Sequence, residues 1–78
     1  MELQDTLNDD IYYIIEIEID NEKRYLYTKN VALHFCDMGK KFLYKWSAQR
    51  YYKGSVFDDM NCNHRIILYS RYKDMILE

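Results

Sequence analysis

Apolar and polar side chains alternate most regularly near the start of the chain. Every second residue from Ile11 to Ile19 is Ile or Tyr, and alternate residues of a strand point to the same face of a sheet. β-Branched side chains also suit a pleated, half-buried surface. The pattern predicts a strand over residues 11–19. Its second face ends in Glu16 and Glu18, so we expect that end to face water or basic groups.

A hairpin is expected directly after this strand. With residues 21–23 as the loop, Ile19 lies opposite Tyr25, and a second strand runs over residues 24–29. This register places Tyr25 on the same sheet face as the alternating Ile residues. The chain is therefore expected to begin with an antiparallel pair of strands that share one apolar face.

Residues 31–38 admit two interpretations. Asn30 is a residue type that caps helices, and Gly39 is one that ends them, with a length between them that fits two turns. A short helix is the preferred prediction, and a strand through residues 33–36 is the alternative. The rest of the chain is predicted to form a third strand, a helical turn closed by Gly54, a polar turn and a last strand, over residues 41–46, 47–53, 58–63 and 65–72.

Length and composition favour one small domain. The 78 residues are too few for two hydrophobic cores, and no repeat or Pro-rich linker interrupts them. We expect a single domain over residues 1–78 with one core, in which residues 1–10 are a loosely ordered lead-in. The predicted fold class is α+β, a small antiparallel sheet of about four strands with one or two short helices. A small, closed all-β barrel is the alternative.

The chain is rich in large aromatic rings. Nine Tyr, three Phe and Trp46 carry more surface than so small a core can hide, since each buried ring removes about 150–250 Å² from water. Several Tyr rings are therefore expected at the surface. Exposed Tyr is typical of binding interfaces, because its flat ring and polar tip give contact area at low entropic cost.

Charges are separated along the chain. The formal net charge is −2, yet eight acids and no base lie in the first 22 residues, whereas all eleven bases lie after them. One interpretation is internal pairing, with Glu16 and Glu18 facing Lys41 or Lys45 on adjacent strands. Exposed pairs of that kind contribute less than about 1 kcal/mol each, so they would fix register more than stability.

The strongest local signal is the segment 40–54, KKFLYKWSAQRYYKG, with five bases, five rings and no acid. Bases that follow phosphates and rings that stack on nucleobases are what a single-stranded nucleic acid requires. The competing interpretation is structural: alternating rings form the inner face of a strand, and the bases form its solvated face. The sequence pI of about 5.6 argues against nucleic acid, because nucleic-acid-binding domains typically have a pI above about 9.

A protein partner fits the same segment best, because exposed Tyr, Trp and Arg are enriched at the hot spots of protein interfaces. Nucleic acid is the alternative partner, and neither a membrane nor a small-molecule substrate is expected. The residues predicted to contact the partner are Tyr44, Lys45, Trp46, Arg50, Tyr51 and Tyr52.

His34, Cys36, Cys62 and His64 account for every His and Cys in the chain, in two mirror-image pairs with one residue between. If both pairs lay on strands, each would share a face and suit tetrahedral zinc. Natural zinc sites mostly have two to four intervening residues, and a helix over residues 31–38 would turn the first pair about 200° apart. Zinc is therefore the less favoured alternative, a disulfide less favoured still, and free thiols without a cofactor are expected.

No pattern indicates catalysis. The chain has only two Gly, so it lacks a glycine-rich phosphate-binding loop. Nothing in the spacing of its Cys and His marks a nucleophile with an oriented base. We therefore expect a protein that is not an enzyme.

The cellular setting is also constrained. The N-terminus is acidic rather than basic and no run of 18 apolar residues occurs, which argues against secretion and membrane insertion. Two cysteines without a disulfide framework fit a cytoplasmic protein. Usage high in Ile, Tyr, Asn and Lys and low in Pro, Gly and Ala is typical of AT-rich genomes. We expect an intracellular monomer or homodimer, encoded by a virus or mobile element, that acts as an inhibitor or adaptor of a host protein.

Overall fold

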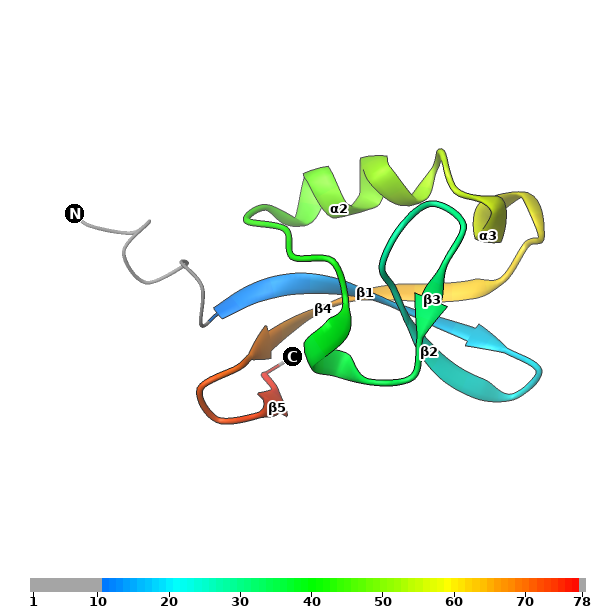
Figure 1. The fold of residues 1–78 in the computed structure, drawn as a ribbon. Helices are drawn as coiled ribbons and strands as arrows, with labels where there is room; N and C mark the ends of the chain where they lie inside the picture. Colours follow the sequence, from blue (N-terminus) through cyan, green and yellow to red (C-terminus); the bar gives the residue numbers. More distant parts are fainter. Residues whose placement is uncertain (1–10, 78) are drawn as a thin grey trace.

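The computed structural model describes residues 11–77, which form an open, five-stranded antiparallel sheet with helices on one face (Figure 1). The strand order is β3-β2-β1-β4-β5. The elements along the chain are β1 (Ile11–Ile19), β2 (Glu22–Leu26), β3 (Ala32–Leu33), η1 (Cys36–Met38), α2 (Lys45–Tyr52), α3 (Val56–Asp59), β4 (Asn63–Ser70) and β5 (Met75–Ile76).

The predicted α+β class is confirmed, with five strands rather than about four. The sheet ends in two short edge strands, β3 and β5, which pair only with β2 and β4 respectively. It is therefore not closed, and the barrel alternative is wrong. Residues 1–10, for which a loose lead-in was expected, lie outside the described residues.

β1 is the central strand, as the alternation predicts, and pairs with β2 on one side and with β4 on the other. The last predicted strand is also confirmed, although β4 begins at Asn63 and ends at Ser70. Both faces of β1 are buried along its middle. Of the two acids expected to face water or basic groups, Glu16 is buried against the base Arg65 and Glu18 is exposed.

The hairpin has a different register from the expected one. Its turn contains two residues, Asp20 and Asn21, whose φ angles are 53° and 67°. Asp and Asn tolerate this left-handed region better than other non-glycine residues, and two positive φ values in succession give a tight turn that matches the strand twist. Tyr25 consequently lies opposite Glu16 instead of Ile19. Since this shift from Ile19 to Glu16 spans an odd number of positions, Tyr25 lies on the opposite face from the predicted one.

Residues 31–46 depart most from the predictions. Neither the helix predicted over residues 31–38 nor the alternative strand over residues 33–36 forms. Instead, Ala32 and Leu33 pair with β2, and the chain then turns through η1. The predicted strand over residues 41–46 is reduced to one bridge, in which Phe42 and Tyr13 exchange two backbone hydrogen bonds of 2.8 and 2.9 Å. The helical turn expected after it is longer and starts earlier, as α2.

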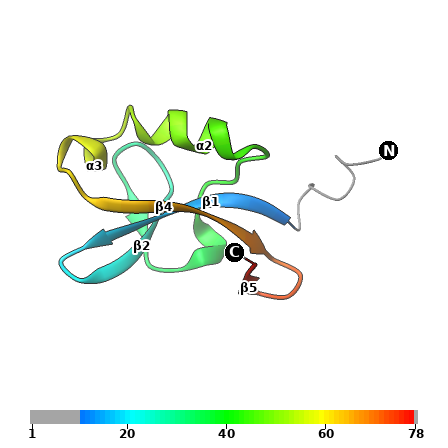
Figure 2. The ribbon, with the colours of Figure 1, turned by 180° about the vertical axis from the view of Figure 1, so that it is seen from behind.

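The sheet carries an apolar cluster on each face, so the single core predicted from chain length is wrong. Helices α2 and α3 cover one face, whereas η1 and β5 lie on the other side (Figure 2). The cluster under the helices consists of Ile15, Ile17, Leu26, Phe42, Ala48, Tyr52 and Phe57. The cluster on the far face consists of Tyr12, Ile14, Tyr25, Ile67 and Tyr69.

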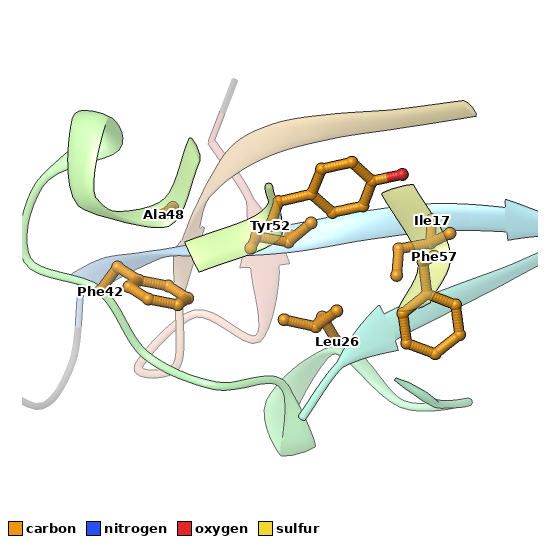
Figure 3. Packing of buried hydrophobic residues seen from close by; sticks show 7 residues of the cluster. Ile17, Leu26, Phe42, Ala48, Tyr52 and Phe57 are labelled. Carbon is orange, nitrogen blue, oxygen red and sulfur yellow. The ribbon is translucent and has the colours of Figure 1, made fainter. Parts of the chain in front are cut away.

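Two clusters fit in so short a chain because large side chains fill both of them. Figure 3 shows the side chains of the first cluster gathered between the helices and the sheet. Three Tyr rings make up most of the second cluster, and each buried ring removes about 150–250 Å² from water. Within residues 11–77, no helix has the length and apolar character needed to span a membrane.

Candidate functional site

The candidate site lies at the start of α2, where two aromatic rings stack on the surface. Tyr44 precedes the helix in an extended conformation, and its carbonyl accepts backbone hydrogen bonds of 3.2 Å from Ser47 and Ala48. Ala48 is fully buried and holds the helix against the sheet. Because residues two apart in a helix point about 200° apart, this anchoring turns Trp46 outward. The rings of Tyr44 and Trp46 stack with centroids 6.0 Å apart.

An open groove of about 590 Å³ runs beside this aromatic pair. Both rings are mostly exposed, Trp46 at 62% and Tyr44 at 52% of their surface. Two partly buried strand residues, one from β1 and one from β4, form the sheet side of the groove. The lining residues are Tyr13, Leu43, Tyr44, Lys45, Trp46, Gln49 and Ile66.

Sequence reasoning identified three of these lining residues and missed the others. Tyr13 and Ile66 belong to strands whose alternation indicates only burial. Leu43 and Gln49 carry no local signal of their own. The groove forms where α2 and the residues before it lie over β1 and β4, which is a tertiary arrangement that no segment encodes alone.

Two further predicted contact residues lie on α2 outside the groove lining. Arg50 is exposed. Tyr51 is half-buried, and its ring packs against Phe42 with centroids 5.4 Å apart. The amino groups of Lys29 and Lys40 each lie 5.2 Å from the centre of the Tyr51 ring, which is within cation–π distance. Tyr51 thus joins three parts of the chain and presents bases around its ring.

Tyr52, the remaining predicted contact residue, is interior. Its side chain is 1% exposed, and its hydroxyl donates a 3.1 Å hydrogen bond to the carbonyl of Cys62. Its ring stacks on that of His64 with centroids 3.8 Å apart. Burial raises the pKa of Tyr52. Tyr52 therefore belongs to the core, because the helix that points Trp46 outward points the residue six positions later inward.

The surface around the groove is basic. Lys45 lines the groove, Arg50 and Lys53 are exposed further along the chain, and α2 contains no acid. No ion pair within residues 11–77 involves these bases. The expected pairing of Lys45 with Glu16 is not formed, because residue 45 lies on a helix rather than on an adjacent strand.

Glu16 is paired instead with a base of the neighbouring strand. Its carboxylate is almost fully buried and accepts a 2.8 Å hydrogen bond from the Nε of Arg65. The hydroxyl of Tyr25 donates a longer bond of 3.5 Å to the second carboxylate oxygen. Burial, followed by contact with Cys36, raises the pKa of Tyr25. The buried acid of β1 is thus paired on the side of the sheet away from α2.

The four residues of the zinc alternative do not come together. Cys36 packs against the far-face cluster, whereas Cys62 packs against the cluster under the helices. His34 is exposed in the loop after β3, and His64 stacks on Tyr52, where burial lowers its pKa. Both thiols are free. Among residues 11–77, no three His, Cys, Asp or Glu side chains are grouped so that they would hold a metal ion.

A second hollow of about 520 Å³ lies on the far face, between η1 and β5. Two of its tyrosine hydroxyls are already bonded: that of Tyr69 donates to Asp74, and that of Tyr25 donates to Glu16. Burial, together with the Asp74 carboxylate, raises the pKa of Tyr69.

Comparison of the chain with protein-family models, with curated proteins and with solved structures finds no match in any of the three.

Proposed function

We propose that the protein is a non-catalytic binding module that recognises another protein through the groove beside α2. The observation that carries this proposal is the stacked pair of Tyr44 and Trp46, which stays more than half exposed although the chain has two cores in which rings are buried. Leaving large apolar rings in water forgoes their burial energy. Stacked rings beside a groove are ready to regain it against a partner.

The composition of the surface supports a protein partner. Trp, Tyr and Arg are the residues that most often dominate binding energy, and they do so around pockets that exclude water. Here Tyr44 and Trp46 flank the groove, Lys45 supplies charge in its lining, and Arg50 is exposed on the same helix. Rim charges mainly steer association and select a partner of opposite sign. The proposed partner therefore presents an apolar anchor next to acidic groups, as the target of a small inhibitor or adaptor would.

Selection from a displayed library of short random peptides tests this proposal with purified protein. Binding of a selected peptide is measured by the fluorescence of Trp46, the single Trp of the chain, and by calorimetry for variants that lack it. We expect Trp46→Ala or Tyr44→Ala to weaken binding about 30-fold, which corresponds to the roughly 2 kcal/mol of a hot-spot residue.

Tyr72→Ala is the matched control, because Tyr72 is 83% exposed and lies away from the groove, in the turn between β4 and β5. It should bind the peptide with unchanged affinity. Enrichment of no peptide, or equal losses in the control and in Trp46→Ala, would contradict a protein-binding role for this surface.

Single-stranded nucleic acid is the second candidate, and one observation favours it. Lys29 and Lys40 flank the ring of Tyr51, so bases and a ring are adjacent as a phosphate backbone and a stacked nucleobase require. Titration with a single-stranded oligonucleotide at about 50 and 200 mM salt separates the two candidates, because several phosphate contacts impose a loss of affinity of orders of magnitude across this range. Tight binding with that salt dependence would favour nucleic acid over protein.

A further inference from the structure

The outer edge of β4 is only partly covered. β4 pairs with β1 along its whole length, but β5 pairs with it only at Tyr69 and Ser70. The backbone N–H of Leu77 donates one more bond, of 2.7 Å, to the carbonyl of Leu68. Figure 2 shows β5 beside the end of β4 alone. From Asn63 to Ile67, no strand of the described chain lies on this side.

The register shows which backbone groups point toward the open edge. Tyr13 lies opposite Leu68, but the backbone N–H and C=O of Tyr13 both form hydrogen bonds with Phe42. The Tyr13–Leu68 pair is therefore not hydrogen-bonded, so the backbone groups of Leu68 point outward, as its bond from Leu77 shows. Backbone direction alternates along a strand, so those of Ile66 and His64 point outward as well. Within residues 11–77 no backbone bond reaches them.

The open edge and the groove form one continuous site. Ile66 lines the groove with its side chain while its backbone groups face the free edge. A strand added beside β4 would project every second side chain to the helix side of the sheet, toward Trp46 and Gln49, which line the same groove. Such a strand would satisfy the N–H and C=O groups of both His64 and Ile66 while filling the groove.

We infer that the partner docks as an extended, acidic segment that adds a sixth strand to the sheet beside β4. This inference rests on the proposed function. The bases of α2 have no acidic partner within the described residues, so charge complementarity selects a segment that carries Asp or Glu beside its apolar anchor among the side chains that project to the helix side of the sheet. Main-chain bonds to an open edge supply affinity, and pockets for alternate side chains supply specificity, as in other complexes formed by strand addition.

A second copy of the chain fits this edge less well. In a two-fold antiparallel pairing that bonds the backbone groups of both His64 and Ile66, His64 of each copy lies opposite Ile66 of the other copy. Arg65 then lies at the centre, opposite Arg65 of the second copy. Like charges directly opposite destabilise a pair of strands. Moving the centre to Ile66 would place His64 opposite Leu68, whose carbonyl already accepts a bond from Leu77.

Amide hydrogen exchange followed by NMR tests the inference, with a peptide selected from the displayed library as the probe. In the free protein the amides of His64 and Ile66 should exchange fast, whereas those of Arg65 and Ile67, which point toward β1, should be protected. Saturating peptide should slow exchange at His64 and Ile66 by at least about tenfold. The inward-pointing amides serve as internal controls on the same strand.

The outcomes separate this inference from the proposed function. A peptide that binds, loses affinity in Trp46→Ala and protects His64 and Ile66 supports both. A peptide that binds and depends on Trp46 but leaves these amides unprotected overturns strand addition and leaves the binding role standing. Protection that rises with protein concentration in the absence of peptide overturns the inference in favour of a second copy. Failure of any peptide to bind removes the proposed function itself.

Discussion

Replacing Tyr52 by Ala should lower the stability of the protein, whereas replacing Trp46 by Ala should weaken binding and leave stability almost unchanged. Both were identified from the sequence as contact residues, yet one is 1% exposed and the other 62%. Truncation of a buried aromatic ring typically costs about 3–5 kcal/mol of unfolding free energy. A substitution of an exposed side chain outside special features usually changes it by less than about 0.5 kcal/mol.

The size of the domain makes the first effect large in relative terms. At roughly 0.05–0.15 kcal/mol per residue, a chain of 78 residues has a total stability of about 4–12 kcal/mol. Tyr52→Ala therefore removes a large fraction of it. Tyr52→Phe keeps the ring and loses only the hydrogen bond to Cys62, so it should cost about 0.5–1.5 kcal/mol.

Urea denaturation followed by far-ultraviolet circular dichroism measures these differences, because Trp46→Ala removes the fluorescent probe. The expected order of stability places Trp46→Ala near the unsubstituted protein, then Tyr52→Phe, then Tyr52→Ala. If Tyr52→Ala does not fold, the comparison between Tyr52→Phe and Trp46→Ala still decides the matter. A loss in Trp46→Ala greater than that in Tyr52→Phe would refute the assignment of Tyr52 to the core and Trp46 to the surface.

Three further predictions follow from buried titratable groups. Burial lowers the pKa of His64, so the unfolded state binds this proton first and stability should fall as the pH drops below about 6.5. Urea midpoints measured as a function of pH should lose this dependence in His64→Phe and keep it in His34→Gln. Burial raises the pKa of Tyr25 and Tyr69, so these hydroxyls ionise first in the unfolded state and stability should fall above about pH 10. In an alkaline titration followed by absorbance, these two Tyr should ionise at higher pH than exposed Tyr. Glu16→Gln removes the charge that holds Arg65, so its urea midpoint at pH 7 should lie below that of the unsubstituted protein.

The parts of the fold that sequence alone predicts are those with sustained periodicity. β1 alternates over nine residues and β4 contains a run rich in Ile and Tyr, and hydrophobic burial then decides both the conformation and the α+β class. The segment from Phe42 to Trp46 shows the limit of this reasoning. Its rings alternate as in a strand, but only Phe42 pairs with a strand, and Trp46 already lies in a helix. Three alternating positions are too few to distinguish a strand from a strand end followed by a helix start.

The same reasoning predicts only part of the candidate site. Composition indicates surplus rings, and the surplus is real: Tyr44 and Trp46 remain exposed. Composition does not indicate which rings they are, because that depends on the direction in which α2 faces the sheet. Tyr52 points inward for this reason. The hairpin register likewise depends on the positive φ angles of Asp20 and Asn21, which permit a turn one residue shorter than expected.

The separation of charge along the chain has a structural explanation that bears on recognition. Arg65 reaches Glu16 on the far face of the sheet, so an acid of the N-terminal part and a base of the C-terminal part neutralise each other there. The bases of α2 lie on the opposite face and have no such acid among residues 11–77. The net charge of −2 therefore does not describe the local charge beside the groove, where α2 carries bases and no acid. A weakly acidic protein can therefore present a basic recognition surface, and the sign of the whole chain is a poor guide to the sign of its partner.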